Sequence, residues 1–309
     1  SVYLGDQLES VFEDIKAGKL LEKAEGGLMD LGLSQILSFE RDPGDRNRTS
    51  PFAFTGNRFE FRAVGSSQSV SGPLVAMNTM LADSLNWIAE KLEATLSDGK
   101  DKTAAVIVVL QELMELHGNV IFGGDGYSSE WHVAAVEERG LKNIPTTADA
   151  LPAYKDSSVI SLFESTGVLS PKELASRFEV YAEQYILAIE VETKLVIDMA
   201  TTKIYPAAVT HLSKLTSTSS SLSGMGLSLE NTGIETVVSE ANAMMSAVHQ
   251  LSAALAQQGF GSEEEHMKHC SDVLCALMLE VRKHADALEG LVDDELWPLP
   301  KYQEMLFIK

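Results

Sequence analysis

Cysteine is almost absent from this chain, which has only Cys270 and Cys275 among its 309 residues. Two cysteines are too few for a disulfide-stabilised scaffold, and residues five positions apart in one helical pattern are poorly placed to bond to each other. We therefore expect a reducing compartment, the cytoplasm or the interior of an organelle. The first residues, Ser1 to Glu9, are acidic and lead into a regular helix pattern, so we expect no secretory or transit segment.

Basic side chains and long apolar runs are also scarce. The chain has 24 Lys and Arg against 45 Asp and Glu, a formal net charge of −21, and its basic residues are scattered. Such a chain repels phosphate backbones and anionic lipid, so neither nucleic acid nor a membrane surface is expected as a partner. The longest purely apolar run, Ala104 to Leu110, is far shorter than the roughly 20 residues that cross a bilayer, so we expect no membrane span.

The composition that remains is that of a folded protein, with 45% hydrophobic and 22% charged residues, and it allows one large or two smaller domains. Apolar residues recur at helical spacing over most of the chain after residue 72, although residues 104–110 fit a buried strand as well. The pattern predicts a helix-dominated α+β protein, with a β-containing region in residues 1–154 and an antiparallel helical bundle in residues 155–309.

Three local features of the bundle are expected from the same pattern. One helix face should run from Phe178 through Leu195 to Met199. Pro206 should kink or end that helix, because proline has no N–H and its ring collides with the preceding turn. The serine-rich tract Ser217 to Ser223 should be a linker or loop.

Residues 58 to 62 alternate strictly, as Arg58-Phe59-Glu60-Phe61-Arg62. In a strand, this period of two puts both arginines and the glutamate on one face and both phenylalanines on the other. We expect the phenylalanines to anchor the strand and the charged face to be presented. A carboxylate held between guanidinium groups keeps its charge and suits Mg²⁺, while the arginines suit phosphate or carboxylate oxygens. The spacing alone also fits a salt-bridged outer face on an edge strand, and from spacing alone this structural interpretation is the commoner one.

Two further groups of residues have a functional and a structural interpretation. His266, His269, Cys270 and Cys275 could form a transition-metal site, but burial of the cysteines as small apolar residues is favoured. The loop 123–126, Gly-Gly-Asp-Gly, could cradle a phosphate. It lacks both the P-loop spacing with its lysine and the dinucleotide fingerprint, so a tight turn is favoured.

The alternating strand belongs to a longer string that resembles the signature of type III glutamine synthetases. The string is Asp45-Arg46-Asn47-Arg48-Thr49-Ser50-Pro51-Phe52-Ala53-Phe54-Thr55-Gly56-Asn57-Arg58-Phe59-Glu60-Phe61-Arg62, continuing into Val64-Gly65-Ser66-Ser67. Further similarity spans nearly the whole chain, and its clearest pieces are Phe122-Gly123-Gly124-Asp125-Gly126-Tyr127, Ser176-Arg177-Phe178-Glu179, Tyr205-Pro206-Ala207 and Trp297-Pro298-Leu299-Pro300. The chain is similar to the C-terminal part of that family, namely the end of its catalytic β-region, with the signature strand at 47–62, and a helical extension.

The resemblance implies a chemistry and a set of roles. Glutamine synthetases join ammonia to glutamate with ATP through a γ-glutamyl phosphate, and they use Mg²⁺ or Mn²⁺. By position, Glu60 resembles the family's carboxylate ligand of the metal nearest the transferred phosphate, and Arg48 resembles the arginine that holds the glutamate substrate. Arg58 and Arg62 resemble the pair that flanks the metal ligand, one contacting nucleotide phosphate and the other the reacting γ-carboxyl group.

The resemblance also implies that this polypeptide is inactive by itself. The family's other metal-binding carboxylates and its ligand histidine lie upstream of the signature, whereas about forty residues precede it here and His117 is the first histidine. One carboxylate among arginines cannot hold the two or three cations of a phosphoryl-transfer site. We expect activity only when a separate N-terminal half completes the site in an oligomer. The alternative is a non-catalytic structural or interaction subunit that binds another protein through its helices.

Overall fold

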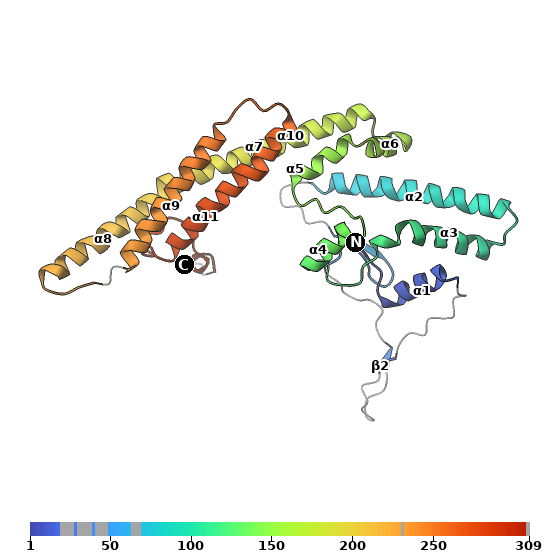
Figure 1. The fold of residues 1–309 in the computed structure, drawn as a ribbon, viewed down its shortest axis with the longest axis horizontal. Coiled ribbons are helices and arrows are strands. Elements are labelled where there is room, and N and C mark those ends of the chain that lie inside the picture. The colour runs from blue at the N-terminus through green and yellow to red at the C-terminus, as the bar shows by residue number, and fades with distance from the viewer. Residues whose placement is uncertain (19–27, 30–38, 41–48, 63–68, 230–231, 307–309) are drawn as a thin grey trace, which may run out of the picture. The chain divides into compact units, whose positions relative to one another are not determined.

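The computed structural model describes residues 1–18, 28–29, 39–40, 49–62, 69–229 and 232–306. Helices make up 72% of the structure, beside a small three-stranded sheet, so the prediction of a helix-dominated α+β fold is confirmed. The chain forms two compact units (Figure 1): unit 1 contains Ser1–Asn143 and Ser161–Ser170, and unit 2 contains Ile144–Ile160 and Pro171–Lys309. The expected domain division after residue 154 stays a prediction.

The sheet of unit 1 contains β1 (Val2–Tyr3), β4 (Phe52–Phe54) and β5 (Phe59–Phe61), in the order β1-β4-β5. Strand β1 pairs in parallel with β4, and β4 pairs antiparallel with β5, so that Ala53 lies opposite Glu60. The β4–β5 turn closes where the Thr55 N–H donates to the Arg58 carbonyl at 2.8 Å. A separate antiparallel pair joins β2 (Leu28–Met29) to β3 (Phe39–Glu40).

The described part of unit 1 also contains several helices. The run 104–110 is helical, because the Asp101 side chain accepts a hydrogen bond from the Ala104 N–H at 2.9 Å and begins a helix that buries Ala105 and Val109. The helices of unit 1 are α1 (Asp6–Lys16), α2 (Ser71–Ser97), α3 (Lys102–His117), the 3₁₀ turn η1 (Gly118–Val120), α4 (Ser129–Glu137) and the second half of α6 (Ser157–Ser165).

Unit 2 is a bundle built on one long helical run and a helical hairpin. Helix α9 (Thr232–Leu255) lies beside α11 (Cys275–Glu289) (Figure 1). Residues 256–262 connect α9 to α10 (Glu263–His269), which continues through η4 (Cys270–Leu274) into α11, so the two arms of the hairpin are antiparallel. Its elements are α5 (Thr147–Ala150), η2 (Leu151–Lys155), α7 (Pro171–Met199), η3 (Ala200–Ile204), α8 (Tyr205–Gly224), α9 (Thr232–Leu255), α10 (Glu263–His269), η4 (Cys270–Leu274), α11 (Cys275–Glu289) and α12 (Tyr302–Leu306).

The core of unit 2 is made of side chains that repeat every three or four residues along these helices. Fully buried members include Phe178, Met244, Leu251, Met267, Leu274 and Leu288. The face expected on α7 was partly wrong, because Leu195 is 54% exposed whereas Phe178 is buried. Among the described helices, none combines the length and the apolar character that a membrane crossing requires.

Pro206 does not end the long helix, contrary to one of the two outcomes expected for it. The helix passes from α7 through a π-helical turn, η3, into α8, and the Tyr205 N–H donates to the carbonyl of Ala200, five residues back. A π-turn is wider than an α-turn, so it gives the proline ring space beside the preceding carbonyls. The helix therefore continues through Pro206 without a break.

The tract Ser217–Ser223 was wrongly expected to be a linker or loop, since it forms the end of α8. Its hydroxyl groups donate to carbonyls four residues back, as Ser221 does to Ser217 at 3.0 Å and Ser223 to Ser219 at 2.9 Å. In this way the hydroxyls bond within the helix instead of pulling the backbone into a turn. The helix ends at Gly224, shortly before Gly226, whose φ of 75° suits glycine.

Residues 144–160 pack on the bundle of unit 2 through charged contacts. Asp149 binds Lys268 with 2.8 Å between carboxylate oxygen and ammonium nitrogen, and Lys155 binds Glu264 at 2.7 Å. The Lys155 ammonium also lies 3.8 Å from the centre of the Phe178 ring. This segment is thus held to α7 and α10 by a cation–π contact and two ion pairs.

Candidate functional site

The β4–β5 hairpin carries a charged triplet on one face. Glu60 is held between two arginines, with Arg58 Nη2 at 3.1 Å from Oε1 and Arg62 Nη2 at 3.2 Å from Oε2. The strand places them together because residues 58, 60 and 62 share a face. The period-two prediction for this triplet is therefore confirmed, while Arg48 lies outside the described residues.

The triplet is polar, accessible and charged. Hydrogen bonds from Arg58 first and Arg62 second lower the pKa of the Glu60 carboxyl group, so it stays ionised at neutral pH. The side chain of Arg58 is 72% exposed, that of Glu60 36% and that of Arg62 28%. A guanidinium group has five N–H donors, and Arg58 directs one of them to Glu60. The hairpin can therefore offer an anionic oxygen and guanidinium donors to one ligand.

The phenylalanines of the hairpin do not anchor it in the way the sequence suggested. Phe59 and Phe61 are 45% and 39% exposed, so the expectation that this face is buried was wrong for the described structure. They share the face with Phe52 and Phe54, and the ring centroid of Phe59 lies 5.1 Å from that of Phe52 and 5.3 Å from that of Phe54. We call these four rings the aromatic face. It is a partly exposed apolar surface on the strands that carry the charged triplet.

The glycine-rich segment of residues 123–126 forms a tight turn, as favoured from the sequence. The Ser128 N–H donates to the Asp125 carbonyl at 3.3 Å, and the Tyr127 N–H donates to the Asp125 carboxylate at 2.9 Å. Ser128 then caps α4 by accepting from the Trp131 N–H at 3.2 Å. Gly126 contacts Thr49, 77 residues earlier, a contact that sequence reasoning missed.

The other candidates from the sequence lie in the bundle. Cys270 is fully buried and Cys275 half-buried, and burial raises the pKa of the Cys270 thiol to about 11, which favours the protonated, unreactive form. Both cysteines are free. In the described part of the chain, no group of three or more His, Cys, Asp or Glu side chains is arranged to hold a metal ion.

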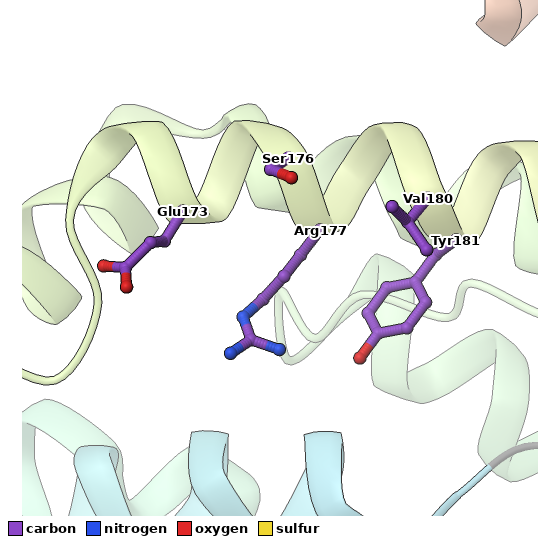
Figure 2. A pocket seen from close by; sticks show the side chains of 5 residues that line it. All are labelled: Glu173, Ser176, Arg177, Val180 and Tyr181. Carbon is purple, nitrogen blue, oxygen red and sulfur yellow. The ribbon is translucent and has the colours of Figure 1, made fainter.

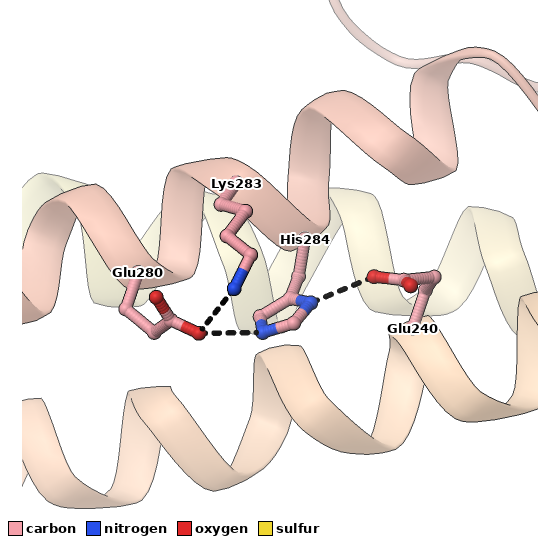
Figure 3. Close-up of polar contacts among 4 residues, drawn as sticks. All are labelled: Glu240, Glu280, Lys283 and His284. Carbon is pink, nitrogen blue, oxygen red and sulfur yellow. Dashed lines mark hydrogen bonds and ion pairs between the residues drawn. The ribbon is translucent and has the colours of Figure 1, made fainter.

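Two polar arrangements on the bundle were not expected. His284 of α11 lies between two carboxylates (Figure 3), 2.7 Å from Glu240 of α9 and 3.1 Å from Glu280, which also binds Lys283. Figure 2 shows a shallow pocket on α7, and the described residues that line it are Glu173, Ser176, Arg177, Val180 and Tyr181.

Comparison with known proteins shows which family the chain is similar to. Residues 105–223 match a family model described as the glutamine synthetase C-terminal domain. The whole chain is 37% identical to the type-3 glutamine synthetase of Dictyostelium discoideum and covers 43% of that protein. It is 32% identical to a glutamine synthetase of Bacteroides fragilis, covering 44%, and 31% identical to one of Butyrivibrio fibrisolvens, also covering 44%. The chain therefore spans less than half the length of the curated relatives that it matches.

Proposed function

Because the chain belongs to the glutamine synthetase family and corresponds to the C-terminal part of its type 3 members, we propose that it supplies the arginine–glutamate hairpin of an ATP-dependent glutamate–ammonia ligase. The observation that carries the proposal is the charged triplet, an ionised Glu60 between Arg58 and Arg62. A salt-bridged edge strand would have the same spacing, and the long similarity to type-3 enzymes favours the catalytic assignment over it.

In the proposed ligase, each residue of the triplet has a role. Glu60 has the hard, ionised oxygens that Mg²⁺ or Mn²⁺ prefers, and such an ion would neutralise charge on the transferred phosphoryl group. Arg58 would bind nucleotide phosphate, and Arg62 would bind the reacting γ-carboxylate of glutamate. Arg48 would hold the glutamate substrate. These roles rest on the family resemblance.

The reaction proposed for the complete site has two transfers. A γ-carboxylate oxygen of glutamate attacks the γ-phosphorus of ATP, and the bond to ADP breaks. Ammonia then attacks the γ-carbonyl carbon, loses a proton and expels phosphate, which gives glutamine. The guanidinium groups stabilise negative charge on the phosphoryl oxygens in the first transfer, where positioning and electrostatics supply most of the catalysis.

We propose that this 309-residue polypeptide does not catalyse the reaction without the rest of the type-3 sequence. Two or three cations at a phosphoryl-transfer site need more carboxylate ligands than Glu60 alone. The aromatic face supports the same proposal, because partly exposed Phe59 and Phe61 are suited to burial under further polypeptide of the same enzyme. Oligomerisation would then also require that polypeptide.

A γ-glutamyl transferase assay with Mn²⁺ or Mg²⁺ and nucleotide tests the proposal. The purified chain should show no turnover, and the chain combined with the remaining N-terminal part of the Dictyostelium relative should show it. In that combination, Glu60→Gln should lower kcat by about 10²-fold or more, because it removes the charge that holds the cation. Glu280→Gln is the matched control, since Glu280 also pairs with a cation but lies in unit 2. Turnover by the chain alone would refute the claim of inactivity, and equal effects of the two variants would refute the role of Glu60.

A non-catalytic interaction subunit is the second candidate, and one observation on α7 favours it. Val180, Leu187, Val191 and Leu195 recur on one face of that helix and are between 45% and 54% exposed. Under this hypothesis, Leu187→Ser would weaken association with a partner. Under the catalytic hypothesis, Phe59→Ser would weaken association with the N-terminal part. Sedimentation of each variant with the N-terminal part tests the catalytic hypothesis, which fails if Phe59→Ser and Leu187→Ser associate with that part equally well.

A further inference from the structure

Gly126 contacts Thr49, which lies three residues before strand β4 of the hairpin that carries the charged triplet. Its N–H donates to the Thr49 hydroxyl oxygen at 2.7 Å. A Cβ added at Gly126 would lie 2.5 Å from the carbonyl oxygen of Thr49 and 3.1 Å from its carbonyl carbon. The φ angle of Gly126 is not positive, so glycine is required here for space and not for an unusual backbone conformation. Only a residue without a side chain allows this approach.

Thr49 lies at the open end of the β4–β5 hairpin, where Arg62 is also held. Two residues after Thr49, the Pro51 carbonyl accepts a hydrogen bond from the Arg62 N–H at 2.7 Å. The Arg62 guanidinium group in turn holds Glu60 at 3.2 Å. A shift of Thr49 is therefore passed through one short stretch of backbone to the arginine and glutamate of the triplet.

The turn that carries Gly126 is itself fixed to the rest of unit 1. The Phe122 N–H donates to the Val2 carbonyl at 3.0 Å, which ties the segment to β1, and Val2 pairs with Phe52 of β4. The Phe122 ring stacks on Trp131 of α4 with 3.7 Å between centroids. The segment thus reaches β4 at two points, through Val2 and through Thr49, and it has a rigid support behind it.

We infer that Gly126, acting through Thr49, is a positioning residue that sets the place of Arg62 and Glu60 for phosphoryl transfer. The inference rests on the proposed function, because the location of the triplet affects phosphoryl transfer only if the hairpin is part of a ligase site. A displacement of about 1 Å at reacting groups can lower the rate about 10²-fold. A small shift of the hairpin at the Gly126–Thr49 contact would therefore be enough to slow phosphoryl transfer. The two residues are 77 positions apart in sequence, one in a turn and the other in the segment just before β4.

The first test uses the 309-residue chain alone and follows amide hydrogen exchange by NMR. Gly126→Ala should increase the exchange rate of the Arg62 amide about tenfold or more while amides of unit 2 keep their rates. Gly123→Ala is the matched control, because a Cβ there meets only the flexible end of Glu9 at 3.2 Å. The inference is overturned if the Arg62 amide keeps its wild-type rate in Gly126→Ala, or if both glycine variants change it equally.

The second test uses the chain combined with the N-terminal part of the type-3 relative. Gly126→Ala should lower kcat by about 10-fold to 10²-fold with the KM for ATP within about threefold of wild type, as expected for a misplaced group. If that variant does not fold, Thr49→Val, which lacks the acceptor, should show the same pattern, and Thr49→Ser, which keeps it, should restore activity. Equal activity of the valine and serine variants would overturn the inference. Absence of turnover in the wild-type combination would instead refute the proposed function, and the exchange test would still decide the positioning role.

Discussion

Arg139 joins the end of α4 to the segment that supports the hairpin, and its removal should loosen unit 1 by a predictable amount. Its guanidinium Nη1 donates to the carbonyl of Ile121 at 2.6 Å and to that of Asn119 at 3.3 Å. The same group lies 5.1 Å from the ring centre of Trp131 and 5.7 Å from that of Phe122. Arg139→Met keeps most of the apolar stem and removes both kinds of interaction.

The size of the effect follows from these contacts. A hydrogen bond from a charged donor contributes about 1.5–3 kcal/mol, and the low end applies because Arg139 is partly exposed and the carbonyls can bind water in its absence. A cation–π contact at such a site adds about 0.5–1 kcal/mol. The shorter bond, to Ile121, and one ring contact together give about 2 kcal/mol, which corresponds to roughly 30-fold faster exchange of amides that open with this part of unit 1.

Hydrogen exchange of the Phe122 amide, which is bonded to the Val2 carbonyl, measures this opening directly. Arg139→Lys should show an intermediate rate, because lysine keeps the charge but not the planar donors. Arg282→Met is the control and should leave the Phe122 rate unchanged, since the Arg282 ion pair with Asp286 is exposed on the surface of unit 2. A Phe122 rate within threefold of wild type in Arg139→Met would refute the reasoning.

Two further predictions concern unit 2. Leu251→Ala should reduce the free energy of unfolding, measured by denaturant titration, by about 2–5 kcal/mol, because Leu251 is fully buried. Leu279→Ala should change it by less than about 0.5 kcal/mol, because Leu279 is 68% exposed. Similar losses in the two variants would contradict the assignment of Leu251 to the core. The buried Cys270 thiol, with its pKa raised from 9.0 to about 11, should favour folding below about pH 9, and this contribution should decline as the pH rises towards 11. Cys270→Ser should therefore flatten the fall in unfolding free energy between pH 9 and pH 11, and an unchanged slope would contradict the assignment.

The charged triplet could be predicted because its signal is local. A period of two in residues 58–62 needs no knowledge of the rest of the fold, and the string around it resembles the signature of type III glutamine synthetases. The same pattern could not predict the exposure of Phe59 and Phe61. Periodicity tells which side chains share a face, but not which polypeptide covers it. The contact of Gly126 with Thr49 is beyond such reasoning as well, because it joins residues 77 positions apart.

The errors in the bundle have local physical causes. The tract Ser217–Ser223 has the composition of a linker, yet its hydroxyls bond to carbonyls of their own helix. Pro206 predicts a kink or a helix end, because its ring collides with the preceding turn of a regular α-helix. The π-turn that accommodates the ring has no signature in a single sequence. Leu195 fits the apolar periodicity of α7 but belongs to its solvent-exposed side.

The π-turn before Pro206 also sets the rotational phase of the second half of the long helix. A π-turn takes up one residue more than an α-turn, and one residue corresponds to about 100° of rotation about the helix axis. The surplus residue in η3 thus determines which side of α8 points inward and brings Ala207 and Ala208 into the core. In a helix without that surplus, the two alanines would face a different direction, and bulkier neighbours would have to pack in their place.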